Sequence, residues 1–256
     1  MNQPASPSRP AVLVTGASRG IGRAIAQQLA RRGCRVAVHF QSNRAAAEAA
    51  LASLEGTGHQ MFAADLAEPG EPERLWAEVT AAFGTVSALV NNAALSRRNP
   101  VLAIDHAGWQ EAWRHTLAAN LFAPADLIHL AANAMAAAGG GRLVSISSRG
   151  AFRGEPENPA YAASKAGLNA LTQSLAVALA GKQVYCFVVA PGWVGTDMSK
   201  ARLEGPQGPS ILAQHPLGRV TAPEEVAAAA VFCVLDAPAA MTGSMLDVNG
   251  ASYLRN

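Results

Sequence analysis

The sequence has almost no net charge and no cluster of basic residues. Its 20 Lys and Arg residues nearly balance 18 Asp and Glu residues, which leaves a formal net charge of +2. Proteins that bind nucleic acid or anionic membranes through charge usually carry a basic patch. The even distribution of charge therefore argues against nucleic acid and membrane surfaces as partners.

Long apolar runs and a targeting segment are also missing. Residues 1–9 contain no apolar core of a secretory signal peptide, so we expect a disordered leader there. No apolar run is long enough to cross a bilayer. These observations predict a soluble, cytoplasmic protein.

Cysteine and histidine are too scattered to form a disulfide framework or a metal site. The three cysteines, Cys34, Cys186 and Cys233, lie far apart in apolar stretches and are expected to be buried free thiols. The six histidines show no metal-ligand spacing. We therefore expect no bound metal.

Apolar residues, in contrast, are abundant and follow two alternating patterns. They make up 50% of the 256 residues, and short β-branched runs alternate with longer Ala-rich runs typical of helices. The expected strands are 11–15, 35–40, 61–65, 88–92, 141–147, 184–190 and 244–248. This alternation predicts an α/β fold, with a single Rossmann-type doubly wound parallel sheet of about seven strands and helices on both faces. We expect one domain over 10–256, with long helices over 109–139 and 160–180.

The segment 197–219 interrupts this alternation. From Ser199 to Arg219 it is rich in Gly and Pro and only weakly periodic, which predicts a loop or a pair of short mobile helices. Ligands of α/β folds bind beyond the carboxyl ends of the strands. We therefore expect this segment to be a substrate lid.

A glycine-rich turn follows the first expected strand and opens a helix. It reads Thr-Gly-Ala-Ser-Arg-Gly-Ile-Gly from Thr15 to Gly22. Glycines let the backbone approach a diphosphate, whose charge is stabilised by the helix N-terminus. The turn therefore indicates a dinucleotide site, although a glycine-rich turn without a ligand has the same composition.

The residues after the second strand indicate which dinucleotide is bound. A carboxylate there would hydrogen-bond the ribose 2′-hydroxyl of NAD, but the stretch 39–44 has none. Arg19 in the glycine turn, with Arg44 or Ser42, is suited to a 2′-phosphate, unless these side chains are simply solvated. The pattern favours NADP over NAD.

A serine, a tyrosine and a lysine predict the chemistry. Tyr161 and Lys165 are four residues apart in an expected helix and so share one face. An ammonium beside a phenol is expected to lower the pKa of the phenol towards neutrality. Ser148 ends the fifth strand and is expected to donate to a substrate oxygen. Tyrosine and lysine at this spacing also occur by chance on solvated helices.

Together these motifs resemble the classical short-chain dehydrogenase/reductase family over about residues 12–250. The similarity rests on several elements in the family's order: the glycine turn, Asn91-Asn92-Ala93-Ala94, Asn120, Ser148 with Tyr161 and Lys165, and Pro191-Gly192 followed by Thr196. Departures are small: Ala94 stands where glycine is usual, and Asn249-Gly250-Ala251 stands where Asp-Gly-Gly is common.

The resemblance implies a role for each matching residue. Tyr161 would be the general acid of reduction, and Lys165 would lower its pKa and bind the nicotinamide ribose. Ser148 would orient the substrate oxygen, and Asn120 would hold a water that links Lys165 to solvent. The expected cofactor contacts are Gly16, Ser18, Arg19, Gly20, Ile21, Gly22, Ser42, Asn43, Arg44, Asp65, Leu66, Asn91, Ala93, Tyr161, Lys165, Pro191, Gly192, Val194 and Thr196.

The expected function is an NADP(H)-dependent oxidoreductase that acts on a small carbonyl or alcohol substrate. Within the family, the reductases of 3-oxoacyl chains on acyl carrier protein are similar in length and motifs. They dock an acidic carrier on basic residues. Among the corresponding positions of this sequence, only Lys182 is basic. A non-catalytic dinucleotide sensor is a further alternative, but such proteins tend to lose the tyrosine or lysine. The resemblance also implies a homotetramer, or a dimer.

Overall fold

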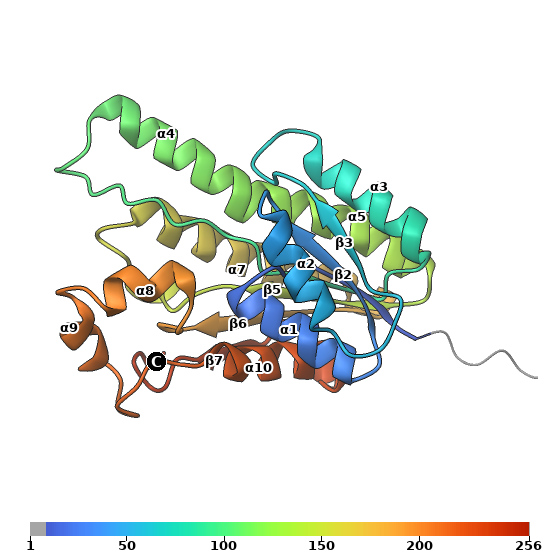
Figure 1. Ribbon diagram of the computed structural model, residues 1–256. Coiled ribbons are helices and arrows are strands. Elements are labelled where there is room, and N and C mark those ends of the chain that lie inside the picture. Colours follow the sequence, from blue (N-terminus) through green and yellow to red (C-terminus); the bar gives the residue numbers. More distant parts are fainter. Residues whose placement is uncertain (1–8, 256) are drawn as a thin grey trace, which may run out of the picture.

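Seven parallel strands form one sheet in the order β3-β2-β1-β4-β5-β6-β7 (Figure 1). The computed structural model describes residues 9–255. The strands are β1 (Ala11–Val14), β2 (Arg35–Phe40), β3 (Gln60–Ala63), β4 (Ala88–Asn91), β5 (Gly141–Ile146), β6 (Val184–Pro191) and β7 (Met245–Val248). The predicted fold class is confirmed, and each strand lies within about two residues of the predicted run. Of the predicted leader, only Arg9 is among the described residues, and its guanidinium donates to the Thr57 carbonyl oxygen at 3.0 Å.

The strand order reverses between β1 and β4. The chain runs outward through β2 and β3, then returns to pair β4 with the other edge of β1, in register Val14 with Val90. A crevice therefore opens where the connections leave in opposite directions, beyond the carboxyl ends of β1 and β4. This is the place where the fold is expected to bind a ligand.

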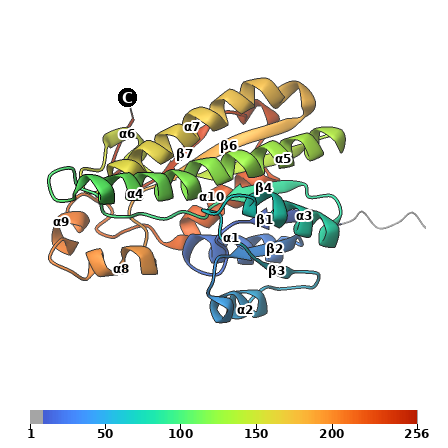
Figure 2. The same cartoon turned by 90° about the horizontal axis from the view of Figure 1, so that it is seen from above.

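Helices cover both faces of the sheet, as predicted. One face carries α1 (Gly20–Arg31), α2 (Arg44–Ala52) and α10 (Pro223–Leu235), and the other carries α3 (Glu71–Phe83), α4 (His106–Leu117), α5 (Ala123–Ala137) and α7 (Pro159–Leu179). In Figure 2, α4 and α5 follow one another end to end, and α7 runs alongside both. Two apolar layers result, one under α1 and α10 and one under α3, α5 and α7.

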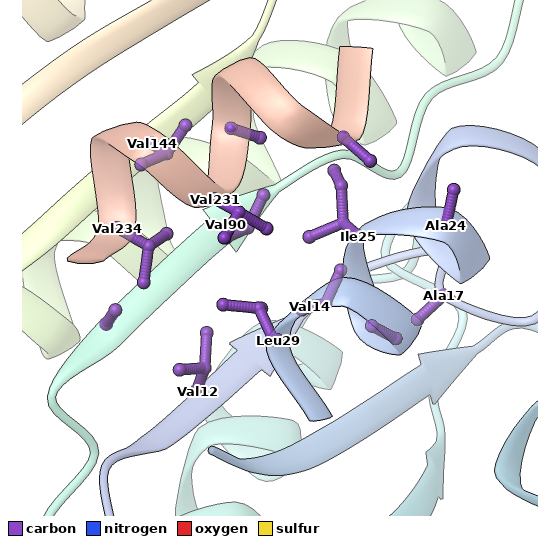
Figure 3. Packing of buried hydrophobic residues seen from close by; sticks show 14 of the residues in the cluster. Val12, Val14, Ala17, Ala24, Ile25, Leu29, Val90, Val144, Val231 and Val234 are labelled. Atoms are coloured by element: carbon purple, nitrogen blue, oxygen red, sulfur yellow. The ribbon is translucent and has the colours of Figure 1, made fainter. Parts of the chain in front are cut away.

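The packing of α1 and α10 fixes the glycine turn that precedes α1. Ile25 and Leu29 of α1 are fully buried and face Val231 of α10 above the valines of β1 and β4 (Figure 3). Burying such a side chain contributes about 1.5–3 kcal/mol, so the start of α1 is held firmly over the sheet. A rigid helix start is a suitable platform for a site.

The predicted helix over 109–139 is divided into two by a short π-helical segment. This segment, η1 (Ala118–Phe122), contains Asn120 and joins α4 to α5. Pro124 explains the irregularity, because it has no N–H to donate to the carbonyl of Asn120 four residues earlier. The chain absorbs the missing bond by widening one turn around Asn120.

The segment predicted as a lid contains two short helices, α8 (Asp197–Leu203) and α9 (Gly208–Leu212). In both views they lie at one end of the molecule, apart from the two helical layers (Figures 1 and 2). The remaining short elements are α6 (Gly150–Arg153), η2 (Ala180–Lys182) and η3 (Ala239–Met241).

The structure also bears on the expectations about thiols, metals and membranes. All three cysteines are free and buried. Within residues 9–255, no group of three His, Cys, Asp or Glu side chains could hold a metal ion. In the same range, no helix is both long and apolar enough to cross a membrane.

Candidate active site

One cavity of about 490 Å³ lies beyond the carboxyl ends of the central strands. Its lining comes from the glycine turn, the end of β2, the segment after β4, the end of β5, α7, and the segment from β6 into α8. The structure thus brings Ser148, Tyr161 and Lys165 together with the glycine turn on one surface. Of the other predicted residues, the lining includes Gly16, Ser18, Arg19, Gly20, Ile21, Ala93, Pro191, Gly192, Val194 and Thr196.

The glycine turn requires glycine at defined positions. Gly16 and Gly20 have φ values of 64° and 53°, a conformation that L side chains rarely adopt. Gly22 has ordinary angles, but a Cβ there would collide with the Gly16 carbonyl oxygen and lie 2.5 Å from Asn92 Nδ2. The first turn of α1 carries no acidic residue and no side-chain cap. Its N–H groups are therefore available to a diphosphate.

Two residues outside the predicted set hold the glycine turn against β4. Thr15 Oγ1 accepts hydrogen bonds from the N–H groups of Asn92 (2.9 Å) and Ala93 (3.0 Å). Asn92 Nδ2 in turn donates to the carbonyl oxygens of Thr15 (2.9 Å) and Gly16 (3.2 Å). The resemblance named Asn92 only as part of a motif, and the structure shows what its side chain does.

His39, at the end of β2, supports the turn from the other side. Its Nδ1 accepts from the Gly16 N–H at 3.0 Å, and its Nε2 lies 3.0 Å from the Ala64 carbonyl oxygen. These contacts require a neutral imidazole with the proton on Nε2. Burial lowers the pKa of His39 to about 4, which keeps the ring neutral. Sequence reasoning missed His39, although a lone histidine at the end of an apolar strand was a visible signal.

The predicted contacts for the adenosine half lie partly outside the cavity. Arg19 lines it and is exposed, without a carboxylate partner among the described residues. Arg44 instead pairs with Glu48 at 2.9 Å, and Asn43 caps α2 by accepting from the Ala46 N–H at 3.0 Å. Five further predicted contacts also do not line the cavity: Gly22, Ser42, Asp65, Leu66 and Asn91.

Gln41, which directly follows β2, lines the cavity where Ser42, Asn43 and Arg44 were expected to do so. Its Nε2 donates to Asp65 Oδ2 at 2.8 Å. The carboxylate of Asp65 is thereby drawn towards β2. Gln41 was quoted in the stretch after the second strand but was not among the predicted contacts.

The catalytic candidates form a compact group around the end of β5. Lys165 is 2% exposed, and its Nζ donates to the Ile146 carbonyl oxygen at 2.8 Å. The same Nζ lies 5.8 Å from the centre of the Tyr161 ring. Ser148 Oγ accepts from the Gly150 N–H at 3.0 Å, and its hydroxyl contacts the Tyr161 phenol.

The pKa of Tyr161 differs from the sequence-based expectation. Burial raises it to about 12, and the contact with Ser148 offsets only part of that rise. Burial also lowers the pKa of Lys165 to about 8, so its ammonium is less firmly charged than a free lysine. The expected lowering of the phenol's pKa is therefore wrong, because burial raises it and the negative charge of Glu155 adds to the rise. The phenol keeps its proton at neutral pH, as a proton donor must.

Asn120 is fully buried, and its side chain is already occupied. Its Oδ1 accepts from the Leu95 N–H, and its Nδ2 donates to the Leu95 carbonyl oxygen, both at 2.9 Å. The Nδ2 also donates to Ser164 Oγ at 3.1 Å. Pro124, four residues later, has no N–H to donate to the Asn120 backbone carbonyl. The predicted water at Asn120 stays a prediction.

The segment after β6 closes the other side of the cavity. The Ser199 N–H bonds to the Thr196 carbonyl oxygen at 3.0 Å, and the Ser199 hydroxyl donates to the Val194 carbonyl oxygen, so the start of α8 is well fixed. Arg202 of α8 lines the cavity, 5.8 Å from the centre of the Trp193 ring, and donates to Asn158 Oδ1 at 2.8 Å. Trp193 and Arg202 were not predicted site residues.

Comparison with known proteins places this arrangement among enzymes. A family model described as enoyl-(acyl carrier protein) reductase matches residues 16–251. The 3-oxoacyl-acyl-carrier-protein reductase FabG of Escherichia coli (strain K12) is 37% identical over 242 residues, which cover 94% of this chain and 96% of that protein. The FabG of Staphylococcus aureus (strain Mu50) is 34% identical over 244 residues, which cover 94% and 97%.

A solved structure shares the fold throughout. The crystal structure of a putative NAD(P)-dependent gluconate 5-dehydrogenase from Beutenbergia cavernae, with bound NADP at low occupancy, matches with a TM-score of 0.85. The two sequences are 35% identical, and the match covers 95% of this chain and 96% of the other.

Proposed function

The chain belongs to the classical short-chain dehydrogenase/reductase family and is an NADP(H)-dependent oxidoreductase, and we propose that Ser148, Tyr161 and Lys165 carry its reaction. The reaction exchanges hydride between the nicotinamide and a carbonyl or secondary alcohol substrate. The observation that supports the proposed residues best is their position on the same cavity as the glycine turn. That cavity lies at the strand-order reversal, where this fold is expected to bind ligands.

The residues around the cavity fit a dinucleotide that carries a 2′-phosphate. Gly22 keeps the backbone of the turn close to α1, whose uncapped N-terminus suits a diphosphate. Arg19 supplies an exposed cation within that turn, and β2 is followed by Gln41 instead of a carboxylate. When bound there, NADPH supplies the hydride that carbonyl reduction needs.

The chain's own groups then handle the substrate oxygen. Ser148 donates its hydroxyl proton to that oxygen, while the Gly150 N–H occupies a lone pair of the Oγ. Tyr161 transfers its proton to the same oxygen as negative charge develops there. Lys165 uses one of its three N–H donors on Ile146, which leaves two for the ribose of the cofactor and for the phenol. The alcohol is released, and Tyr161 regains its proton through the path that Lys165 and Asn120 begin.

The names of the related proteins suggest two substrate classes. One is the 3-oxoacyl thioester of an acyl carrier protein, and the other is a hydroxy acid such as gluconate. Docking of an acidic carrier is disfavoured, because Lys182 is exposed but the neighbouring segment 136–141 has no charged residue. We therefore keep the acyl-carrier reaction as the alternative and favour a free small substrate.

The outer face of η1 and α7 is suited to subunit contact. Phe122 and Val177 are large apolar side chains on these adjacent elements, and they are 57% and 85% exposed. We propose that this face pairs in a homotetramer or dimer, and that the enzyme works in the cytoplasm. Light scattering of the wild type beside Val177→Asp tests the pairing, and an unchanged molar mass of the variant contradicts it.

The proposed function is tested by NADPH oxidation, followed at 340 nm, against ketones, oxo acids, 3-oxoacyl thioesters and quinones. We expect turnover with at least one class, and a clear preference for NADPH over NADH. Arg19→Ala should raise the KM for NADPH about tenfold or more, because a charged hydrogen bond contributes about 1.5–3 kcal/mol. Arg31→Ala, at the other end of α1, is the matched control. NADPH binding without turnover on any class would favour a sensor.

A further inference from the structure

Behind Ser148 lies a charged group that the proposed reaction does not use. Arg149 follows Ser148 directly, lines the same cavity, and is only 3% exposed. Its backbone N–H bonds to the Pro191 carbonyl oxygen at 2.9 Å, so its position between the ends of β5 and β6 is fixed. A buried guanidinium is normally paired with a carboxylate, because its desolvation is costly.

Arg149 has no such partner among the described residues. Its guanidinium donates to Gln214 Oε1 at 2.9 Å and to the Ser252 carbonyl oxygen at 3.4 Å, and both acceptors are neutral. Arg153 donates to the same Gln214 Oε1 at 3.1 Å. Two cations thus share one neutral oxygen. In contrast, seven other arginines within residues 9–255 pair with carboxylates.

The surroundings confirm that negative charge is scarce there. Burial and the charge of Arg153 lower the pKa of Arg149, and Glu155, which also lines the cavity, is the acidic group that opposes them. Glu155 forms no ion pair with either arginine in the described part of the chain. The hydroxyl of Ser252 is buried without a hydrogen-bond partner, so a further donor is available beside Arg149.

We propose that Arg149 and Arg153 bind a carboxylate of the substrate, so that the enzyme acts on short oxo acids and their hydroxy acid products. The amide oxygen of Gln214 is planar and accepts from both guanidinium groups, as one oxygen of a carboxylate would. The bound acid would supply the missing charge in place of the Gln214 oxygen. Of the two arginines, Arg149 lines the cavity, as Ser148 does, so an acid held by Arg149 would direct its carbonyl towards that cavity. This inference rests on the proposed function and deepens it by naming the substrate class.

Three matched pairs of probes test the preference for an acid. Acetoacetate, 4-oxopentanoate and 5-oxohexanoate are compared with their methyl esters, which have the same carbon chain without the charge. We expect at least one acid to be reduced with a kcat/KM about tenfold or more above that of its ester, mainly through a lower KM. If all three esters match or exceed their acids, the inference is overturned while the proposed function stands.

Gln214→Glu provides the sharpest variant, because it keeps the size of the side chain and places a permanent carboxylate on the two arginines. We expect the acid-to-ester ratio of kcat/KM to fall about tenfold, while the melting temperature rises. Gln207→Glu adds the same charge to the exposed start of α9 and should leave the ratio unchanged. An unchanged acid-to-ester ratio in Gln214→Glu would contradict the proposal and show that the two arginines only hold the segment that carries Gln214.

Binding to Tyr161→Phe separates the two proposals. Calorimetry with NADPH present should show that the variant binds acetoacetate or a longer oxo acid more tightly than the ester. Adding Arg149→Met to this variant should remove the difference, whereas Arg149→Lys should retain part of it. If Tyr161→Phe binds the acid more tightly than the ester but the wild type reduces neither, the carboxylate site is supported and the proposed reaction is refuted. Equal binding of acids and esters would overturn the carboxylate site alone.

Discussion

Replacing His39 should make the protein less sensitive to mild acid. The imidazole is 2% exposed, and it accepts from Gly16 through Nδ1 while Nε2 faces the Ala64 carbonyl oxygen. A second proton would place two N–H donors against each other at Gly16. His39→Asn removes the titrating ring and keeps a short polar side chain at the end of β2.

The magnitude follows from the difference between the folded and unfolded pKa of His39. Burial lowers this pKa from 6.5 to about 4, so the unfolded chain takes up a proton first as the pH falls. The stabilisation is therefore complete above pH about 6.5 and is lost progressively towards pH 4. At 1.36 kcal/mol per pH unit, the loss is about 2 kcal/mol at pH 5 and approaches 3 kcal/mol at pH 4.

The assay is equilibrium urea unfolding at pH 7.5, 6 and 5, at one fixed protein concentration, because association would otherwise change the apparent stability. From pH 7.5 to 5, the wild type should lose about 2 kcal/mol more than His39→Asn. His129→Asn, at an exposed position of α5, controls for the loss of any histidine. If the wild type and His39→Asn lose equal free energy, the neutral, buried state of His39 is not what supports the glycine turn.

Two further predictions concern the cofactor turn and the proton donor. Gly22→Ala should cost about 1–3 kcal/mol of stability and weaken NADPH binding, because the new Cβ would collide with Gly16. Urea unfolding measures the stability, and calorimetry measures the NADPH affinity. Gly181→Ala is the control and should change neither quantity, because Gly181 has open space around it. The kcat/KM for carbonyl reduction should fall above pH about 8, where Lys165 loses its proton, well before Tyr161 titrates near 12. A stopped-flow pH profile that stays flat to pH 10 would show that the charge of Lys165 is not required.

The sheet was readable from the sequence because strands of a buried parallel sheet are continuous apolar runs. The run Ala11–Val14 is apolar at every position, and the run that ends at Ile146 is apolar at Leu143, Val144 and Ile146, so both strands could be recognised. The π-helical turn was not predicted, because the Ala-rich periodicity continues across Asn120. Its only local signal was Pro124, four residues later.

Charges and pKa values were harder to predict than positions. Arg44 was a candidate for a phosphate, but Glu48 lies one turn later on the same helix and pairs with it. The pKa of Tyr161 depends on burial, and neither that burial nor the enclosure of Arg149 can be read from neighbours in the sequence. Such properties arise only when segments distant in the chain, such as 148–153 and 214–252, are packed together.

The most direct test of the reaction is the turnover of Tyr161→Phe beside its affinity for NADPH. The variant loses only the hydroxyl that donates the proton, so we expect its Kd for NADPH to stay within about twofold and kcat/KM to fall about 100- to 10,000-fold. A variant that keeps most of its turnover, or that loses turnover only because NADPH no longer binds, would contradict the role of Tyr161 as the proton donor.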